Sequence, residues 1–322
     1  MRCLYCGRTI KETAGAEEIK NCWHEKCIKE FFGTEEMPFI DISSEQLEKL
    51  ANDAVNKGIT VPGVQKKLSL HLSQEGESRL TIVDYPTGYI LKPQTEEFES
   101  LPEFEHLSMR LAQIAGIKTV PNALIKISDG YAYITKRVDR QIKDGRNMLL
   151  AMEDFCQLAG RMTRDKYKGS YEACARIAGQ YSVRKGFDMT ELFMRVLFSF
   201  ITGNSDMHLK NFSLREESPA SRSFALSEAY DMLPVNIVMP EDDEELALTL
   251  NGRKKKIKKA DFIAFAGSCE ITETAAEKII LKMCSLEQKF MAECEQSLLN
   301  DESKEKIKEL ISQRIKRLAD RQ

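Results

Sequence analysis

The segment GNSDMHLKNF, at residues 203–212, holds the side chains best suited to chemistry in this 322-residue chain. Its Asp206 and Asn211 are spaced D-x4-N, which lets one loop hold a base beside a hydroxyl and an oxygen ligand beside phosphates. Asp231, in the segment AYDML, is a candidate for a second oxygen ligand of Mg²⁺. We therefore predict phosphoryl transfer, with Asp206 as the proton acceptor and with Asn211 and Asp231 at the metal.

Phosphoryl transfer from a nucleotide also needs cations and backbone N–H groups around the phosphates. Lys92, in the strand-like segment GYILKP, is placed for this purpose, and Glu105 on the next predicted helix is placed to hold it, with Glu103 as the alternative. The stretch TVPGVQKKLSL, at residues 60–70, is the candidate phosphate loop, although Gly63 is its only glycine. Along the chain, the candidate phosphate loop comes first, then the lysine and its carboxylate, and the candidate base and metal ligands follow.

A second group of reactive side chains lies near the start of the chain, where Cys3 and Cys6 are spaced C-x2-C. His24 and Cys27 are spaced H-x2-C. Two such pairs joined by a loop can supply the four tetrahedral ligands that structural Zn²⁺ prefers. Cys22 is a fifth candidate, and we favour His24 because H-x2-C at the start of a predicted helix mirrors the first pair. We expect a structural site, since four protein ligands leave no open position.

Hydrophobic periodicity divides the chain into a sheet-rich part and a helical part. Strands are predicted at 67–73, 79–83, 88–93, 123–128 and 131–138, the last two joined by the turn signal Asp129-Gly130, and a short strand is predicted within 223–233. Helices are predicted at 41–58, 102–116, 152–162, 170–182 and 190–203, and from Ser303 onward. The predicted domains are a zinc-knuckle-like module at 1–34, a sheet-rich unit at 35–140 and a helical unit at 141–322.

Composition limits the classes of protein to which the chain can belong. Hydrophobic residues make up 42% and charged residues 30%, which suits a globular protein. The formal net charge of -3 argues against binding nucleic acid through bulk charge. The basic run at 253–259 follows the acidic run at 241–245, so we favour a mutually screening surface over a patch for RNA or a phosphorylated partner.

The first 30 residues do not fit a signal peptide, because charges and cysteines stand where an apolar stretch is needed. The most apolar run, at 192–202, contains Arg195 and is shorter than the about 20 residues that span a bilayer. We therefore expect a cytoplasmic protein without a membrane partner. The five cysteines beyond Cys27 fall in apolar segments and are expected to pack between helices.

Several of these segments together are similar to a known family. GVQKKLSL, YILKP, KRVDR, MEDFCQ, GNSDMHLKNFSL and AYDML resemble the HipA-type serine/threonine kinase family, the toxin components of bacterial toxin–antitoxin systems. The resemblance spans about residues 60–262, and its most specific part is D-x-H-x-K-N-F-S followed by Tyr-Asp. It implies an α+β, two-lobed protein-kinase-like fold with a small sheet-rich N-lobe and a helical C-lobe, here preceded by the zinc-knuckle module.

The resemblance also implies roles for the matching residues. ATP with Mg²⁺ is implied as the phosphate donor, and Asp206 is implied as the catalytic base. The implied ATP-binding residues are Pro62, Gly63, Val64, Gln65, Lys66 and Lys67 in the phosphate loop, Lys92 at the phosphates, Lys136, Arg137 and Val138 at the adenine hinge, and His208, Leu209, Lys210, Asn211, Tyr230 and Asp231 beside the nucleotide.

Members of this family inactivate themselves by phosphorylating a serine just before the phosphate loop, and the matching position here is Thr60. A phosphate there would add a charge of about -1.5 to -2 beside the ATP phosphates, and the repulsion would oppose ATP binding. The resemblance therefore implies autophosphorylation at Thr60 as an inactivating switch.

The resemblance implies partners as well. Relatives phosphorylate aminoacyl-tRNA synthetases, which implies a translation-related protein substrate. A small helix-turn-helix antitoxin is implied, through which alone the chain would meet DNA. A separately encoded N-terminal subdomain is implied too, because only 59 residues precede Thr60 here. Two alternatives stay open: a small-molecule kinase of the same broad fold, and a catalytically weak zinc-bearing adaptor.

Overall fold

The computed structural model describes residues 1–39, 67–73, 78–83, 88–128, 130–143 and 146–319. The predicted helix at 41–58, Thr60, the phosphate-loop residues 62–66 and Asp129 lie outside the described residues. The chain divides into two compact units. The first comprises Met1–His106 and Val120–Arg140, and the second comprises Leu107–Thr119 and Gln141–Gln322.

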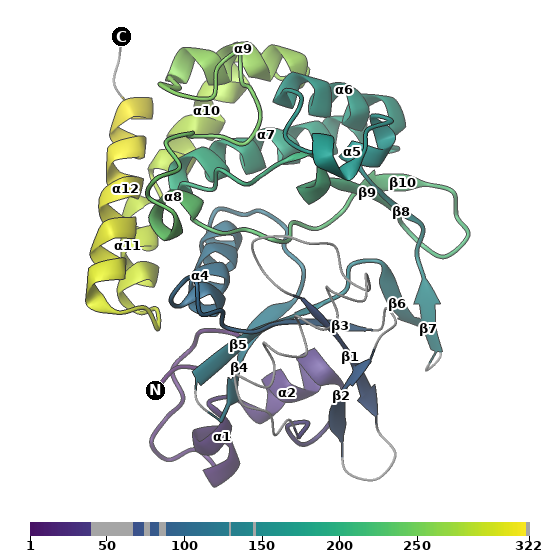
Figure 1. Cartoon of the computed structure of the whole chain (residues 1–322), viewed down its shortest axis with the longest axis vertical. Helices are drawn as coiled ribbons and strands as arrows, with labels where there is room; N and C mark the ends of the chain where they lie inside the picture. Colours follow the sequence, from purple (N-terminus) through teal and green to yellow (C-terminus); the bar gives the residue numbers. More distant parts are fainter. Residues whose placement is uncertain (40–66, 74–77, 84–87, 129, 144–145, 320–322) are drawn as a thin grey trace. The chain divides into compact units, whose positions relative to one another are not determined.

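The described part of the first unit is built on a five-stranded antiparallel sheet with the order β2-β1-β3-β5-β4 (Figure 1). The strands are β1 (Leu68–Ser73), β2 (Arg79–Val83), β3 (Tyr89–Lys92), β4 (Asn122–Ile127) and β5 (Gly130–Lys136). In β1, Leu68 and Leu70 are buried while His71 is exposed, so the alternation predicted from the sequence gives the strand one inward face. All five predicted strands are confirmed to within two residues at their ends.

The first unit also contains two short helices, α1 (Ala16–Asn21) and α2 (Glu25–Phe32). The buried residues of α2 recur at helical spacing and include Cys27 and Phe31, so this helix has one apolar face. A longer helix, α4 (Leu101–Ile114), confirms the helix predicted at 102–116, and the division between the two units falls within it.

The second unit combines a three-stranded sheet of order β10-β9-β8 with helices, within the residues that are described. Its strands are β8 (Met152–Asp154), β9 (Ser213–Glu216) and β10 (Phe224–Leu226), and a separate pair is formed by β6 (Arg140–Lys143) and β7 (Arg146–Leu149). The helices are α5 (Phe155–Leu158), η1 (Thr163–Asp165), α6 (Tyr171–Tyr181), α7 (Lys185–Thr202), η2 (Leu209–Asn211), α8 (Val235–Val238), α9 (Lys259–Ser268), α10 (Glu273–Cys284), α11 (Glu287–Glu295) and α12 (Asp301–Ala319).

Helix α7 runs through the core of the second unit. Its Phe193 ring stacks on Phe265 at a centroid distance of 5.8 Å, and its Phe200 ring meets Phe262 edge-on at 5.5 Å. Both partners lie on α9, which the sequence pattern did not delimit. The helices predicted at 170–182 and from Ser303, and the short strand within 223–233, are confirmed, and the helix predicted at 190–203 is confirmed with an earlier start at Lys185.

The helix predicted at 152–162 is wrong in its first part. Met152 and Glu153 instead pair with β9 as strand β8. The helix then begins at Phe155, because Asp154 and Gln157 form a reciprocal capping box around its first turn. It is only four residues long. Asp154 and Gln157, to which the sequence assigns no chemistry, therefore support a helix start.

The acidic and basic runs of the second unit pair with each other, as favoured from the sequence. Lys255 Nζ lies 2.5 Å from Asp243, and Lys254 Nζ lies 2.9 Å from Glu244. Such exposed pairs contribute little to stability, but they neutralise both runs locally. Among the described residues, no helix has the length and apolar character needed to cross a membrane.

Candidate active site and metal centre

The D-x4-N loop of the second unit starts where helix α7 ends. Gly203 stands directly after the last helical residue, with a φ of 72° and its N–H bonded to carbonyls of the preceding turn. The positive φ favours glycine, and a Cβ at Gly203 would lie 2.4 Å from the Leu310 side chain of α12, which would have to move. The chain can therefore turn sharply from a buried helix into the loop.

Hydrogen bonds within the loop fix Asp206 and Asn211 relative to each other. The Asn211 side-chain N–H donates to the Asp206 carbonyl at 2.8 Å, and the Asp206 N–H donates to the Asn204 side chain at 3.2 Å. Asn211 is buried, and because its amide nitrogen is used internally, its amide oxygen is the atom suited to a cation. The structure thus gives the loop the rigidity that a base and a metal ligand would need.

Two neighbouring side chains lie near oxygen Oδ1 of the Asp206 carboxylate. The Tyr167 hydroxyl donates a hydrogen bond to this oxygen, and His208 Nε2 lies 3.9 Å from it. The His208 side chain is buried, and its ring meets the Tyr167 ring edge-on at 5.0 Å. Tyr167 is a residue that the sequence motif does not reveal, because it lies almost 40 positions before Asp206 in an unremarkable basic stretch.

Asp231 is positioned by its backbone and by its neighbour Tyr230. Asp231 has a φ of 59°, which lies in the left-handed region. A residue with a side chain pays about 1–3 kcal/mol to adopt this conformation, and such residues cluster at functional sites. The Tyr230 hydroxyl lies 2.5 Å from Ser213 Oγ and donates to the Lys210 carbonyl at 3.2 Å. Burial raises the pKa of the Tyr230 phenol, so this residue stays a neutral donor. Tyr230 therefore connects the Asp231 segment to the D-x4-N loop.

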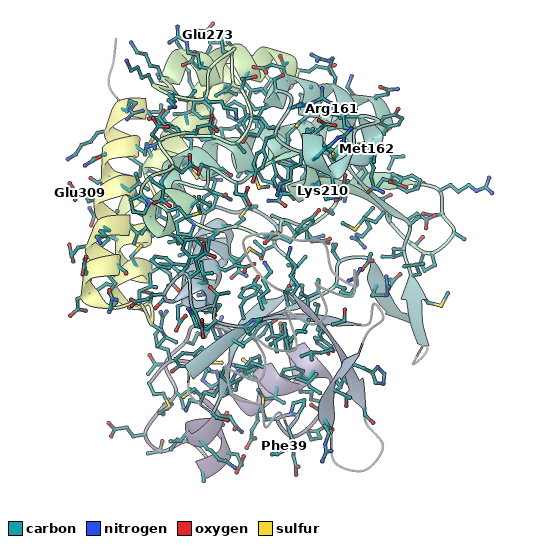
Figure 2. The ribbon with its side chains drawn as sticks, in the orientation of Figure 1. Phe39, Arg161, Met162, Lys210, Glu273 and Glu309 are labelled. Atoms are coloured by element: carbon teal, nitrogen blue, oxygen red, sulfur yellow. The ribbon has the colours of Figure 1, made fainter. Side chains whose placement is uncertain are left out.

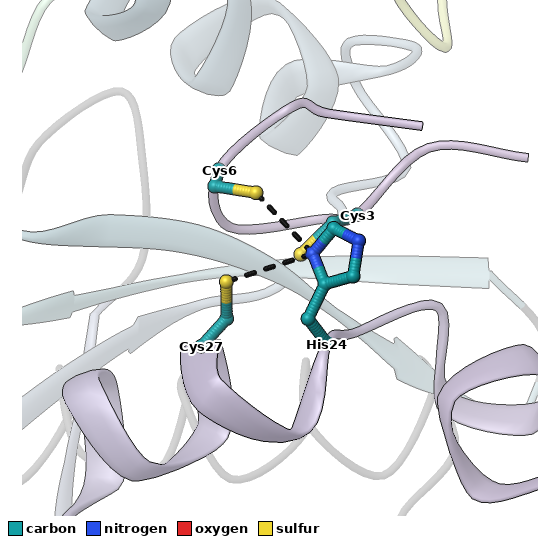
Figure 3. Close-up of side chains that lie close together, drawn as sticks. All are labelled: Cys3, Cys6, His24 and Cys27. Carbon is teal, nitrogen blue, oxygen red and sulfur yellow. Dashed lines mark hydrogen bonds between the residues drawn. The ribbon is translucent and has the colours of Figure 1, made fainter. Parts of the chain in front are cut away.

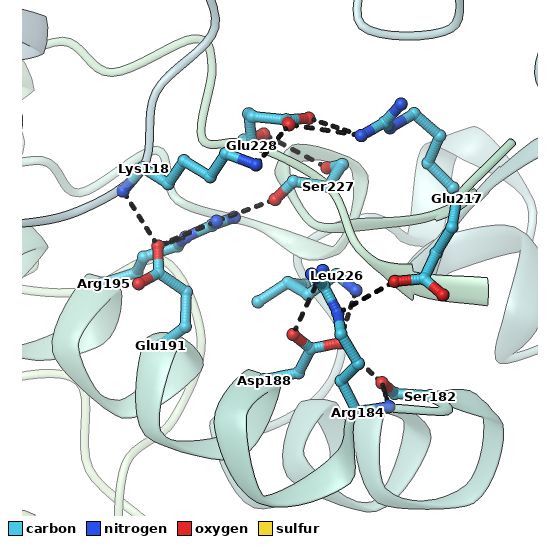
Figure 4. A network of polar contacts seen from close by, with 11 residues as sticks. Lys118, Ser182, Arg184, Asp188, Glu191, Arg195, Glu217, Leu226, Ser227 and Glu228 are labelled. Carbon is cyan, nitrogen blue, oxygen red and sulfur yellow. Dashed lines mark hydrogen bonds and ion pairs between the residues drawn. The ribbon is translucent and has the colours of Figure 1, made fainter.

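Buried charges on α7 hold the strand that leads to Asp231 (Figure 4). Asp188 Oδ2 accepts hydrogen bonds from the Leu226 N–H at 2.6 Å and from Ser182 Oγ at 2.5 Å. Arg195 Nη2 donates to the Ser227 carbonyl at 2.7 Å. Both charged groups have only 1% relative exposure, so they act as fixed anchors for β10 and for the residues after it.

Lys210 points to the cap of helix α5. Its Nζ lies 2.6 Å from Asp154 Oδ2, and Lys210 is labelled in Figure 2. The same Asp154 side chain caps α5, so the capping carboxylate also fixes a residue predicted to lie beside the nucleotide. Leu209, the other predicted nucleotide neighbour in this turn, is buried in η2.

In the first unit, Lys92 and Glu105 form a buried ion pair. Lys92 Nζ lies 2.5 Å from Glu105 Oε1, and their side chains are 3% and 1% exposed. Lys92 is the last residue of β3, opposite Tyr133 of β5, and its ammonium lies 5.4 Å from the Tyr133 ring centroid. The contact that the sequence led us to expect is present, and it is made with Glu105 rather than Glu103, whose carboxyl pKa is raised by burial.

The residues predicted to form the hinge stand at the end of β5. Lys136 ends the strand, and burial lowers the pKa of its ammonium. The Arg137 backbone N–H donates to the Gly88 carbonyl at 2.9 Å. Its guanidinium donates two hydrogen bonds of 3.0 and 2.8 Å to the Asp139 carboxylate. Val138 is half-buried between them. Lys67, the one phosphate-loop residue that the structure describes, stands directly before β1.

Cys3, Cys6, His24 and Cys27 come together at the start of the chain (Figure 3). One ligand atom from each lies within 4.8 Å of all the others. His24 Nδ1 is 3.4 Å from Cys6 Sγ and 3.7 Å from Cys27 Sγ. In a tetrahedral site with ordinary Zn–S and Zn–N bonds, a sulfur and a nitrogen ligand stand about 3.6 Å apart. These two sulfur–nitrogen distances match a tetrahedral Zn²⁺ site, and the four ligand atoms lie close enough together to hold the ion.

The surroundings of His24 support this fit. Its other ring nitrogen, Nε2, lies 3.3 Å from the Thr9 carbonyl. If Nε2 donates this bond, Nδ1 has its lone pair directed at the cysteines, which is the usual arrangement for a metal-bound histidine. Cys22, the alternative ligand, instead directs its thiol to the Ile19 carbonyl at 3.7 Å. The structure thus groups His24, and not Cys22, with the three cysteines.

The cysteine module is attached to the sheet of the first unit. The Trp23 indole N–H donates to the Leu124 carbonyl of β4 at 3.1 Å, and the Tyr89 hydroxyl of β3 donates to the Phe31 carbonyl at 3.3 Å. The Phe31 and Tyr89 rings lie 5.9 Å apart, and the Lys136 ammonium lies 5.4 Å from the Phe31 ring centroid. The module therefore contacts β3, β4 and β5, including the strand that ends at the predicted hinge.

Comparison with solved structures defines the class of fold. HipA of Shewanella oneidensis MR-1, solved in complex with HipB and its operator DNA, matches with a TM-score of 0.71 and 18% identity, over 86% of this chain and 71% of that one. The proinflammatory kinase CtkA of Helicobacter pylori matches with a TM-score of 0.52 and 12% identity, over 77% of this chain and 93% of that one. The chain thus has a mixed α+β, kinase-like fold.

The sequence places the chain in a family. Residues 59–290 match the model of the HipA-like C-terminal domain, and the chain belongs to this family. The kinase candidate Y4dM of Sinorhizobium fredii is 31% identical over 66% of this chain and 54% of its own length. The serine/threonine-protein kinase toxin HipA of Shewanella oneidensis is 25% identical over 48% of this chain and 39% of its own. The chain spans about half the length, or less, of these curated relatives.

Proposed function

We propose that the chain is an ATP- and Mg²⁺-dependent serine/threonine protein kinase with Asp206 as its catalytic base. The observation that carries the proposal is the loop geometry, in which the Asn211 amide is bonded to the backbone of Asp206 and both residues stand at fixed positions. Kinship with proteins named as kinases supports it. The proposal is tested by measuring the transfer of labelled phosphate from ATP to protein, with an Asp206 variant as the negative control.

In this proposal each residue of the second unit has a separate task. Asp206 accepts the proton of the substrate hydroxyl as the oxygen attacks the γ-phosphate, and ADP leaves. Asn211 and Asp231 supply oxygen ligands for Mg²⁺, which would neutralise charge on the phosphates when bound. His208 and Lys210 lie in the same loop and provide donors for the nucleotide.

In the first unit we assign Lys92 to the ATP phosphates, with Glu105 fixing its position. The residues Lys136 to Val138 are assigned to the adenine ring, and the loop from Pro62 to Lys67 to the phosphates. An ammonium buried at 3% exposure needs a charged partner, and Glu105 supplies it at 2.5 Å. The pair would hold the Lys92 ammonium in a fixed orientation. A phosphate oxygen could then take the place of Glu105 or bind the ammonium together with it.

Replacing Glu105 with glutamine should therefore impair both stability and nucleotide binding. Loss of one member of a buried ion pair costs about 3–5 kcal/mol, because it takes away the opposite charge that offsets the burial of the other member. We expect a clear fall in melting temperature and at least about tenfold weaker ATP binding by titration calorimetry. Glu103→Gln, two positions earlier on the same helix, is the matched control. If Glu105→Gln bound ATP as tightly as the wild type, the assignment of Lys92 to the ATP phosphates would be wrong.

We also propose that Thr60 is autophosphorylated. Protein purified from active expression should carry phosphate on Thr60, since a charge of about -1.5 to -2 there would repel the ATP phosphates and shut the enzyme down. Peptide mass mapping measures this directly, and protein with Asp206→Asn should lack the modification. Phosphate found only at other residues would refute the assignment of Thr60.

The partners are proposed on the same kinship. The solved Shewanella complex contains HipA, HipB and operator DNA, and by analogy we propose a small DNA-binding antitoxin for this chain. We further propose an aminoacyl-tRNA synthetase as the substrate. Phosphoproteomics after brief expression of the wild type against Asp206→Asn would name the substrate.

A further inference from the structure

Tyr167 lies in the turn between η1 and α6, and its hydroxyl contacts the proposed catalytic base. Its hydroxyl donates to Asp206 Oδ1, its ring contacts His208, and the Lys166 ammonium lies 4.9 Å from its ring centroid. All of these residues belong to the second unit. The contact therefore does not depend on how the two units are arranged.

The backbone around Tyr167 is fixed to the catalytic loop, while its side chain is not part of the core. The Leu209 N–H donates to the Lys166 carbonyl at 3.2 Å, and the Tyr171 hydroxyl donates to the Met207 carbonyl at 3.0 Å. Tyr171 is fully buried, whereas Tyr167 is 40% exposed. The Tyr167 side chain can thus leave Asp206 without opening the hydrophobic core.

A tyrosine hydroxyl offers the carboxylate the same kind of bond that a substrate serine or threonine must make. A base has to lie within about 2.6–3.2 Å of the hydroxyl whose proton it accepts. Burial, together with the Asp206 carboxylate, raises the pKa of the Tyr167 phenol above its usual range, so the group stays a donor. A substrate hydroxyl and Tyr167 would then compete for one carboxylate oxygen.

We infer that Tyr167 caps the catalytic base in the absence of substrate, and that the hydroxyl of the protein substrate displaces it. The inference rests on the proposed function, since it takes Asp206 to be the base. Tyr167 is here an autoinhibitory residue, which lowers activity at low substrate concentration. It leaves the maximal rate unchanged, because the substrate hydroxyl has taken its place at saturation.

Tyr167→Phe tests the inference, because it removes the hydroxyl and keeps the ring. Purified enzyme is incubated with γ-labelled ATP, Mg²⁺ and a dilution series of bacterial lysate whose endogenous kinases have been heat-inactivated. A hydrogen bond to a charged group changes an equilibrium constant by about tenfold. We expect Tyr167→Phe to label lysate protein about three- to tenfold faster than wild type in dilute lysate, and the two rates to converge in concentrated lysate.

The controls separate this inference from the proposed function. Tyr181→Phe, at an exposed tyrosine of the same unit, should match wild type at every dilution, and melting curves should show Tyr167→Phe to be folded. Labelling by Tyr167→Phe that is equal to or slower than wild type at all dilutions, while wild type exceeds Asp206→Asn, overturns the cap and leaves the kinase intact. Wild-type labelling no higher than Asp206→Asn overturns both.

Discussion

Replacing Asp206 with asparagine should lower phosphotransfer by about 10²–10⁴-fold, the usual contribution of a positioned general base. Asparagine has the shape of aspartate and still accepts the Tyr167 hydrogen bond through its amide oxygen, so the loop should keep its structure. It cannot take the proton of the attacking hydroxyl. Intact-mass measurement of autophosphorylation after expression, and growth of the expressing cells, should both report the loss.

The matched control for this variant is Asp243→Asn. Asp243 is an exposed aspartate in the same unit, and its contact with Lys255 is a surface pair of small energetic value. It should leave autophosphorylation and the growth of the expressing cells as they are with the wild type. If Asp206→Asn kept the wild-type level of phosphorylation, Asp206 would not be the base, and the D-x4-N interpretation would have to be abandoned.

The second large effect is expected at the cysteine module. Metal analysis of the purified protein should find about one zinc per chain, and replacing Cys27 with serine should remove it. Binding of a structural zinc supplies about 10–16 kcal/mol in small zinc-dependent modules, which is as large as the total stability of most domains. A segment of 34 residues buries too little apolar surface to fold without such help.

Loss of the metal should extend to the sheet of the first unit. Trp23 and Phe31 of the module hydrogen-bond to strands β4 and β3, and Phe31 packs against Tyr89. Cys27→Ser should therefore lower the melting temperature strongly and weaken ATP binding, because β3 carries Lys92. Cys22→Ser is the matched control, since the Cys22 thiol is directed to Ile19. Retention of zinc by Cys27→Ser, or its loss in Cys22→Ser, would contradict this ligand set.

The sequence was sufficient to predict the elements whose signals are local. Alternating strands, the hairpin of β4 and β5, and the amphipathic α12 depend on residues that are neighbours along the chain. The same holds for the two cysteine and histidine pairs, whose spacing alone indicates a shared metal. Placement of Lys92 on a strand, with a carboxylate on the next helix, was enough to anticipate their ion pair.

Other features depend on contacts between distant residues and have no local signal. Tyr167 reaches Asp206 across 39 positions, and its basic surroundings look like a solvated surface. Arg195 served in the sequence only as a charge that argues against a membrane span, yet it is buried against the Ser227 carbonyl. The strand at Met152 was mistaken for a helix because its partner, β9, lies about 60 residues away.

The central claim, that this chain transfers phosphate from ATP to protein, is tested most directly by labelling. Purified wild type and Asp206→Asn are incubated with γ-labelled ATP, Mg²⁺ and heat-treated bacterial lysate, and protein is separated from small molecules before counting. The account predicts label in discrete protein bands with the wild type alone. Label confined to the small-molecule fraction, or equal label with both proteins, would contradict it.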